Sequence, residues 1–241
     1  MKFIEPTWNC ILQDVKRLNV GMQKSFNFFE EGSGAQSILS LSEDQIVNII
    51  QKNKHYLKLL LTEAGIHNYS KAIKHIPKHK IFGSGSGDFD LVIYGPTYPF
   101  ELISFEFKRI KVEALDYSSD KVNKISGIET LFYQLEERVK MGFHAVYGII
   151  IIHSDLRERR TANTILRSHT VETNEMLFYE INSLKSFPTE AGLILIKYEQ
   201  PTGKDSAINF KVGRVKFAEK LQQNDETREK FQNYLNLSNF A

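Results

Sequence analysis

Apolar residues recur with helical spacing in two long segments of the chain. In the first, LSEDQIVNIIQKNKHYLKLLLTEAG, the repeating apolar residues are Ile46, Ile49, Ile50, Leu57, Leu60 and Leu61. Ser42 and Gln45 form a capping-box pattern before this segment and Gly65 follows it, so the pattern predicts a helix over 43–63. The second, VNKISGIETLFYQLEERVKMG, predicts a helix over 122–141. Further helical segments are predicted before Gly32, over residues 68–75 and 155–182, and in the tail from Ala218.

Other runs are typical of β-strands. DFDLVIYG and FELISFEFKRIKV are rich in aliphatic and aromatic residues, and the sequence GPTYP between them predicts a hairpin-like turn. HAVYGIIIIH and TEAGLILIKYE are continuous apolar runs of the kind that a sheet buries on both faces. INFKVGRVKF, at 208–217, predicts an edge strand. Strands are therefore expected near residues 81, 89 and 105, over 145–153, and in the two later runs.

The order of these elements predicts an α/β fold, a sandwich of helices around a mixed sheet. A chain of 241 residues can bury a sizeable core and suits one domain, 1–241. Within it, residues 1–78 are expected to be mainly helical and residues 79–200 to contain the core of the sheet. Residues 201–241 would add an edge strand and a C-terminal helix.

Composition and charge narrow the class of protein. The net charge is only +2, so any contact with nucleic acid must come from local basic clusters such as KRIK (108–111) and RERR (157–160). No apolar run approaches the roughly 20 residues of a membrane helix, and the N-terminus lacks the apolar core of a secretion signal. The single cysteine, Cys10, is expected to be a small buried hydrophobe in a reducing compartment. We therefore expect a cytoplasmic protein with no membrane association.

The segment IFGSGSGDFDLVIYG, residues 81–95, combines glycines with an acidic pair. Loops that bind phosphate lead from a strand through glycines into a helix, whose N-terminal amides face the anion. Here the glycines lead into a strand, and Asp88 and Asp90 occupy the positions where a phosphate would lie. The glycines therefore predict a flexible loop that lets a substrate approach the acids.

The acids have a partner in the next strand. In ISFEFKRIK the alternation places Glu106 and Lys108 on one strand face, with Phe105, Phe107 and Arg109 on the other. A carboxylate and a lysine among aromatic residues are costly to bury without partners. If the two strands are neighbours, Asp90 and Glu106 converge with Lys108 beside them. Two such oxygen ligands suit Mg²⁺, which keeps several waters, and the lysine can stabilise the nucleophile or developing negative charge.

An Asp on one strand followed by Glu-x-Lys on the next resembles the PD-(D/E)xK nuclease superfamily. GDFDLVIYG supplies Asp90, and SFEFKR supplies Glu106 and Lys108. The resemblance covers roughly residues 40–155 and implies a restriction-endonuclease-like α/β/α sandwich, with a central mixed sheet flanked by helices. The implied activity is hydrolysis of phosphodiester bonds, with DNA as the expected substrate, by a Mg²⁺-dependent endonuclease, with Mn²⁺ as the alternative ion. Members act in restriction, repair, recombination or phage defence, and cutting both strands would call for a homodimer or a partner protein.

The resemblance also implies roles for single residues. Asp90 and Glu106 would bind the metal, with the backbone carbonyl of Phe107 as a further ligand. Lys108 would position or activate the attacking water. Gln134, on the later helix, would orient Lys108 or a phosphate. The supporting candidates are Asp88, Arg138 and an acid on the first helix, either Glu43 or Glu63.

Two other classes of function stay open. FGSGSGDFD also resembles the nucleotidyltransferase signature, in which Gly83 and Ser84 would precede the acids Asp88 and Asp90. Glu106 could be the third acid, on the neighbouring strand, and two metals would join a nucleotide to an acceptor. In that family about ten residues and a helix separate the serine from the acids, whereas here only three residues do. The third class is a nuclease-like domain that binds nucleic acid or a protein without cleaving.

Plain structural interpretations apply to the remaining polar and aromatic residues. His153, Asp155 and the cluster 157–160 are expected to form a helix start and a solvated face, which could also line a DNA channel. The pair His75 and His79 has metal-like spacing but no third ligand nearby, which predicts a surface position. Three aromatic residues near the turn are expected to belong to the core or to a lid: Tyr94, Tyr98 and Phe100.

Overall fold

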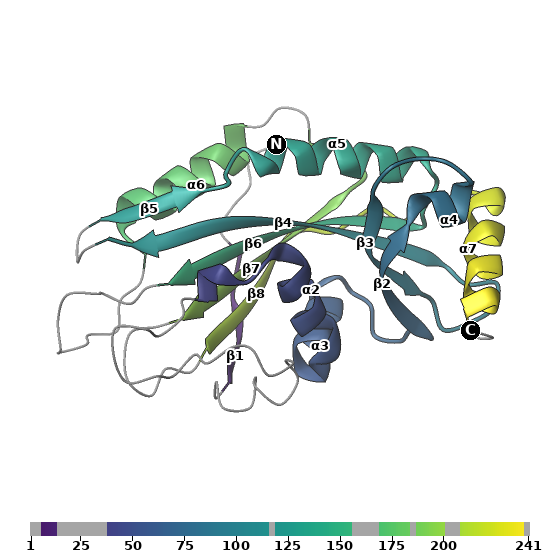
Figure 1. The fold of residues 1–241 in the computed structure, drawn as a ribbon, viewed down its shortest axis with the longest axis horizontal. Coiled ribbons are helices and arrows are strands. Elements are labelled where there is room, and N and C mark those ends of the chain that lie inside the picture. The colour runs from purple at the N-terminus through teal and green to yellow at the C-terminus, as the bar shows by residue number, and fades with distance from the viewer. Residues whose placement is uncertain are drawn as a thin grey trace.

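The computed structural model describes residues 6–13, 38–115, 119–155, 169–183, 187–200 and 208–238. These residues form one mixed sheet of eight strands with helices on its faces (Figure 1), which confirms the predicted α/β class. The strands are β1 (Asn9–Gln13), β2 (Lys71–Pro77), β3 (Asp88–Tyr94), β4 (Leu102–Ala114), β5 (Asp120–Asn123), β6 (Ala145–Asp155), β7 (Gly192–Gln200) and β8 (Ile208–Lys216). The helices are the 3-10 turn η1 (Ile38–Ser40), α2 (Glu43–Lys52), α3 (Lys54–Glu63), α4 (Lys78–Phe82), α5 (Gly127–Lys140), α6 (Val171–Ser183) and α7 (Asp225–Ser238).

The sheet has the strand order β1-β8-β7-β6-β4-β3-β2, with β5 paired to the end of β4. β4, β6 and β7 are parallel to one another, and the other pairs are antiparallel. The hairpin-like turn predicted between β3 and β4 is present, since these strands pair antiparallel. β6 follows β4 through α5, which is the usual way to connect two parallel strands.

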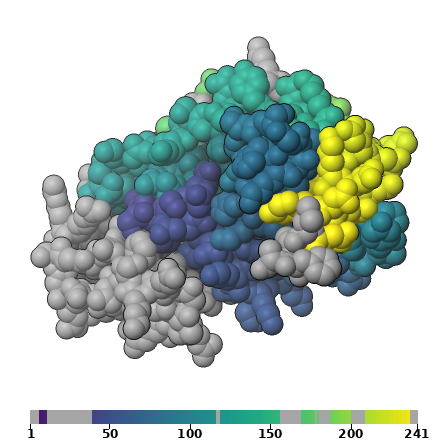
Figure 2. All heavy atoms as spheres, turned by 45° about the vertical axis from the view of Figure 1, so that its right-hand side comes forward, coloured from purple at the N-terminus to yellow at the C-terminus, as the bar shows by residue number. Residues whose placement is uncertain are grey.

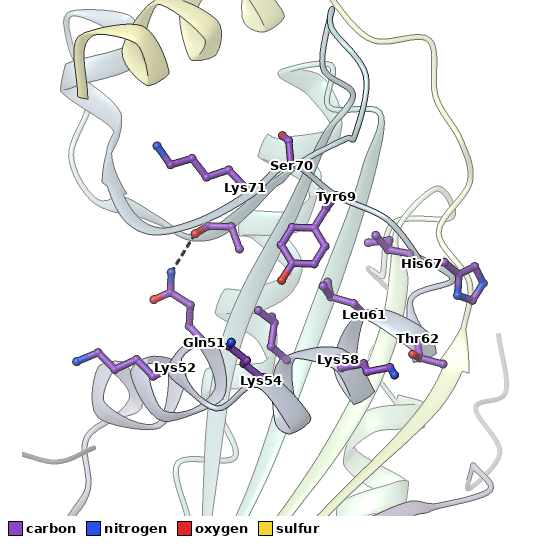
Figure 3. Close-up of a pocket in the computed structure, with 13 residues that line it drawn as sticks. Gln51, Lys52, Lys54, Lys58, Leu61, Thr62, His67, Tyr69, Ser70 and Lys71 are labelled. Atoms are coloured by element: carbon purple, nitrogen blue, oxygen red, sulfur yellow. Dashed lines mark hydrogen bonds between the residues drawn. The ribbon is translucent and has the colours of Figure 1, made fainter. Parts of the chain in front are cut away.

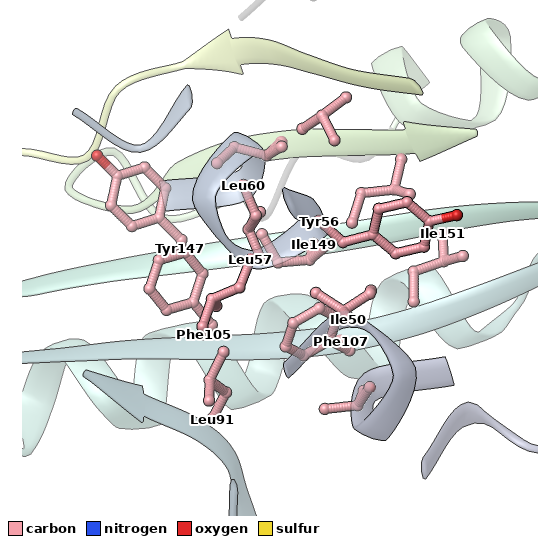
Figure 4. Packing of buried hydrophobic residues seen from close by; sticks show 14 of the residues in the cluster. Ile50, Tyr56, Leu57, Leu60, Leu91, Phe105, Phe107, Tyr147, Ile149 and Ile151 are labelled. Carbon is pink, nitrogen blue, oxygen red and sulfur yellow. The ribbon is translucent and has the colours of Figure 1, made fainter. Parts of the chain in front are cut away.

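Each face of the sheet has its own hydrophobic core. The first core joins α2 and α3 to one face, and its residues include Phe105, Phe107 and Ile149 (Figure 4). The second core joins α5, α6 and α7 to the other face. β6 contributes to both cores with alternate residues, which explains its continuous apolar sequence. At Gly148 a Cβ atom would lie 2.8 Å from Leu135 Cδ1, so the glycine lets α5 approach the sheet.

The predicted helix over 43–63 is two helices. The capping box of Ser42 and Gln45 is present, and Gly65 ends the second helix with a φ of 75°. Asn53 interrupts the pattern because it has an extended backbone, with φ −86° and ψ 106°. Its Oδ1 accepts hydrogen bonds from the backbone N–H groups of His55 and Tyr56, and so caps α3.

The segment before β3 differs most from the prediction. The helix expected over 68–75 is wrong, because Lys71–Pro77 is strand β2 and pairs with β3. The strand expected near residue 81 is also wrong, because Lys78–Phe82 is the short helix α4 and Ile81 packs into the second core. Pairing with β3 outweighs the weak local preference of this polar segment. The part of the chain before residue 79 thus contributes strands β1 and β2 as well as α2 and α3.

Three further boundaries are corrected. The predicted helix over 122–141 begins only at Gly127, because Asp120–Asn123 continues the hairpin of β4 as β5. The helix expected from residue 155 is wrong at its start: His153 and Asp155 are buried in β6 rather than forming a helix start on a solvated face, and α6 begins at Val171. The tail helix begins at Asp225 rather than at Ala218.

The predictions for side chains outside the motif are confirmed in some cases and wrong in others. Cys10 is exposed on β1, so the expectation of a buried hydrophobe is wrong. Tyr94 is a core residue, whereas Tyr98 is 70% exposed. The cluster 157–160 and the helix expected before Gly32 lie outside the described residues. Among the described residues, no helix is long and apolar enough to cross a lipid bilayer.

Candidate active site

Strands β3 and β4 separate at the position where the sequence predicted a site. Their ladder runs from Tyr94↔Leu102 to Leu91↔Phe105, and beyond it Phe89 and Asp88 pair only with β2. The Asp90 carboxylate lies at this separation, where its Oδ2 accepts a 2.8 Å hydrogen bond from the backbone N–H of Phe107. A side chain thus takes over the hydrogen bond that the strand would have made, which fixes the carboxylate beside β4.

Glu106 lies next along β4, on the face that α5 covers, and is completely buried. Its Oε1 accepts hydrogen bonds from Nε of Arg138 at 2.7 Å and from Oγ of Ser104 at 3.3 Å. Its Oε2 is buried and has no hydrogen-bond partner among the described residues. A buried carboxylate oxygen without a donor is costly, so this atom is available to a ligand.

Arg138 is the principal partner of Glu106 and is itself completely buried. Its Nη1 donates to the Glu137 carboxylate at 2.9 Å, and its Nη2 donates to the backbone carbonyl of Asp88 at 3.2 Å. The guanidinium also lies over the ring of Phe89, 4.3 Å from the ring centroid. Arg138 therefore joins α5 to both strands of the site instead of lying on a solvated helix face.

Lys108 and Glu43 complete the cluster. Lys108 Nζ lies 3.5 Å from Oε1 of Glu43, and Oε2 of Glu43 accepts a 2.8 Å hydrogen bond from the backbone N–H of Arg109. Glu43 is the first residue of α2, so the start of this helix brings a third carboxylate to β4. Figure 2 shows the start of α2, the segment from β2 to β3 and the α5 region meeting on one face of the molecule.

The three carboxylates influence one another electrostatically. Burial, with a smaller contribution from the charge of Asp90, raises the pKa of Glu106 to about 7, although Arg138 opposes the shift. Burial also raises the pKa of Asp90, against the opposing hydrogen bond from Phe107 N–H and the charge of Lys108. The pKa of Glu43 is raised by burial and by Asp90, with Lys108 opposing. The fold therefore disfavours the ionised form of each acid, and a bound cation would reduce the free-energy cost of ionising them.

The structure brings most of the predicted site residues together. Asp90 and Lys108 lie close enough to Glu106 for their charges to shift its pKa, and Glu43 and Arg138 contact Lys108 and Glu106. Asp88 contributes its backbone carbonyl, while its side chain is exposed. Glu63 lies elsewhere, where its Oε1 accepts a 2.6 Å hydrogen bond from Asn9 Nδ2, so its candidacy is wrong.

Two candidate residues contribute less directly. Gln134 lies on α5 one turn before Arg138, and within the described part of the chain its buried Oε1 has no hydrogen-bond partner. Phe107 is anchored on both sides, since its ring packs in the first core and its N–H binds Asp90.

Three residues of the site were not predicted. Ser104 precedes Glu106 by two positions on the same strand face, so the alternation of β4 carried a signal for it. Glu137 and Lys78, joined at 2.8 Å, connect α5 to α4. No sequence pattern indicates this pair, because it depends on where α4 lies.

The donor set suits a hard divalent cation. Among the described residues, no three side chains of His, Cys, Asp or Glu are grouped to bind a metal together. Mg²⁺ requires only one or two carboxylates, because it keeps several waters and takes further oxygens from its substrate. Asp90 and the unpartnered Oε2 of Glu106 fit this requirement.

Comparisons with protein-family models, with curated protein sequences and with solved structures give no match to this chain. Function is therefore inferred from the chemistry of the site. Its central feature is a pair of carboxylates and a lysine at the separation of two strands.

Proposed function

We propose that the protein is a Mg²⁺-dependent nuclease of the PD-(D/E)xK type that hydrolyses phosphodiester bonds in DNA. The observation that carries the proposal is the convergence of Asp90 and Glu106, with Lys108 beside them, where β3 leaves β4. The element order supports it: the helices α2 and α3, three antiparallel strands, α5, and a strand parallel to β4. Apart from α4, between β2 and β3, and β5, between β4 and α5, this is the order that a restriction-endonuclease-like fold has.

The residues have distinct roles in this proposal. Asp90 and Oε2 of Glu106 would bind Mg²⁺, with the Phe107 carbonyl as a further ligand. When bound, Mg²⁺ supplies a water of lowered pKa and polarises a phosphoryl oxygen. Arg138 holds Oε1 of Glu106 and so leaves Oε2 for the metal.

Lys108 would act on the reacting groups themselves. Its ammonium, oriented by Glu43 at 3.5 Å, would donate a hydrogen bond to the attacking water or to the charge that develops on the phosphate. Gln134 would orient a phosphate from α5.

The nucleotidyltransferase alternative receives less support from the loop before β3. Gly83 ends α4 in a left-handed conformation, with φ 72°, and β3 begins at Asp88. No helix starts between Ser84 and Asp88, a segment that the structure describes in full, so no helix N-terminus faces a triphosphate there. That alternative also gives Lys108 no role.

The test is incubation of purified protein with plasmid DNA and with single-stranded circles, in Mg²⁺ and in chelator. We expect cleavage that requires Mg²⁺ and is lost in Asp90→Asn and Lys108→Met. Lys140→Met, at the exposed C-terminal residue of α5, is the matched control and should cleave like wild type. DNA binding without cleavage under any metal would overturn the proposal and favour the non-catalytic class.

A further inference from the structure

A second feature of the molecule is a groove away from the cluster of acids. It lies between α2 and α3 on one side and residues 66–72 on the other, with a volume of about 770 Å³ (Figure 3). Gln51 Nε2 donates a 3.0 Å hydrogen bond to the backbone carbonyl of Ala72 and joins the two sides. Of the described residues that line the groove, four are lysines, at positions 52, 54, 58 and 71, and none is acidic.

The stretch of sequence that forms the groove is basic, and four of its lysines line the groove. Residues 45–87 contain seven lysines and one acid, so this stretch carries +6, whereas the rest of a chain of net charge +2 carries −4. The one acid, Glu63, is buried and hydrogen-bonded to Asn9, so it does not offset the lysines at the surface. A concave basic surface on a nearly neutral protein indicates a specific anionic ligand.

The groove also has apolar and aromatic surface. Leu57, Leu61 and Ile66 line it, and the ring of Tyr69 projects between its two sides, with 41% of the residue exposed (Figure 3). Lysines beside an apolar floor and an exposed aromatic ring suit a strand whose bases are unpaired, since the bases can stack while the phosphates meet the lysines. A duplex offers no free base faces to such a floor.

The groove and the acids lie at opposite ends of one helix. α2 runs from Glu43, in the cluster of acids, to Lys52, at the groove, which is about 15 Å for ten residues. Between them Lys74 Nζ donates a 2.6 Å hydrogen bond to Oδ1 of Asn48 and adds a further positive charge along this path. A strand bound in the groove can therefore extend along α2 to the acids.

We propose that this groove binds single-stranded nucleic acid and, resting on the proposed nuclease function, holds the substrate strand a few nucleotides from the site of cleavage. Lys54 and Lys58, both exposed on α3, contact phosphates. Tyr69 stacks on a base.

The first experiment measures binding of fluorescent oligo(dT) by anisotropy, in chelator, over a range of salt concentrations. We expect the double variant Lys54→Gln/Lys58→Gln to bind at least 10-fold more weakly and to lower the salt slope by about 1.4, since each single-strand phosphate contact contributes about 0.7. The control Lys140→Gln/Lys220→Gln removes the same charge at exposed positions and should match wild type. Equal losses of oligo(dT) affinity in both double variants would overturn the proposal that the groove binds the strand.

The second variant separates stacking from charge. Tyr69→Leu should weaken binding by roughly 5- to 150-fold, the range expected from loss of one stacked base, and leave the salt slope unchanged. Tighter binding of a duplex of equal length, or of phosphatidylserine vesicles, would overturn the proposal.

Because binding is measured in chelator, the two proposals fail separately. If the groove variants lose binding but no form of the protein cleaves DNA, the groove proposal stands and the nuclease proposal is wrong. If the protein cleaves DNA and the groove variants bind like wild type, the nuclease proposal stands and the groove proposal is wrong.

Discussion

Arg138 Nε lies 2.7 Å from Oε1 of Glu106, and both side chains are completely excluded from solvent. Removing two charges from water costs several kcal/mol each, and the loss is recovered only where geometry and further hydrogen bonds are good. Arg138 meets this condition through Glu137, the Asp88 carbonyl and the ring of Phe89. Glu106 meets it on one oxygen only. Arg138 therefore offsets part of the cost of burying Glu106, and one carboxylate oxygen stays without a donor.

Breaking this pair from the arginine side should be costly. Arg138→Met leaves Glu106 buried without its partner, so we expect the free energy of unfolding to fall by about 3–5 kcal/mol, the usual range for a broken buried pair. Urea denaturation monitored by circular dichroism measures it. The exposed Lys140→Met is the control and should change stability by less than about 0.5 kcal/mol. An Arg138→Met protein as stable as this control would show that the pair contributes nothing.

Asp90→Asn gives the sharpest test of the metal site. Asparagine keeps an oxygen that can accept the hydrogen bond from Phe107 N–H, so the variant should melt close to wild type in chelator. It loses the negative charge, so the rise in melting temperature that Mg²⁺ gives wild type should disappear, together with cleavage. Differential scanning fluorimetry over a Mg²⁺ titration measures the shift. If Asp90→Asn keeps the full Mg²⁺ stabilisation, the metal does not bind at Asp90.

The sequence predicted what depends on local periodicity. Glu106 and Lys108 share a strand face because alternation along β4 is a property of the strand itself. The capping box at Ser42 and the end of the helix at Gly65 were likewise predictable, because caps involve residues only a few positions apart.

The features that the sequence did not predict depend on distant parts of the chain. Residues 71–77 form a strand because β3 offers a partner, although their own pattern looked helical. Arg138 is buried because its guanidinium bonds to Glu106 and packs on the ring of Phe89. The helical pattern of α5 alone does not indicate these contacts. His153 is buried because β6 runs further than its apolar residues indicated.

Lys108 and Ser84 distinguish the two kinds of chemistry. Lys108→Met should abolish cleavage and leave Mg²⁺ affinity nearly unchanged, because an ammonium is not a metal ligand. Ser84→Ala should cleave like wild type, since Ser84 is exposed in the loop before β3. A gel assay of plasmid cleavage and a Mg²⁺ titration provide the two measurements. The reverse ranking, with incorporation of labelled nucleotide from a triphosphate, would identify a nucleotidyltransferase instead.

His153 should make the fold sensitive to acid. It is completely buried in β6, and its ring lies 5.5 Å from that of Tyr198. None of the residues that the structure describes forms a hydrogen bond with its ring nitrogens. Burial lowers the pKa of His153 to about 3, with the charges of Arg109 and Lys111 acting in the same direction and Asp155 opposing.

The sign of the effect follows from the two protonation states. Between about pH 6.5 and pH 3 the unfolded chain binds a proton at His153 that the folded chain does not, so the free energy of unfolding falls as the pH is lowered. His153→Phe keeps the ring beside Tyr198 and removes this proton, so its stability advantage over wild type should be about 2 kcal/mol larger at pH 5 than at pH 7.5. Urea denaturation at both pH values measures the difference. His55→Phe, at an exposed position on α3, is the matched control and should keep the pH dependence of wild type. If His153→Phe shows that same dependence, the histidine takes up its proton within the folded protein.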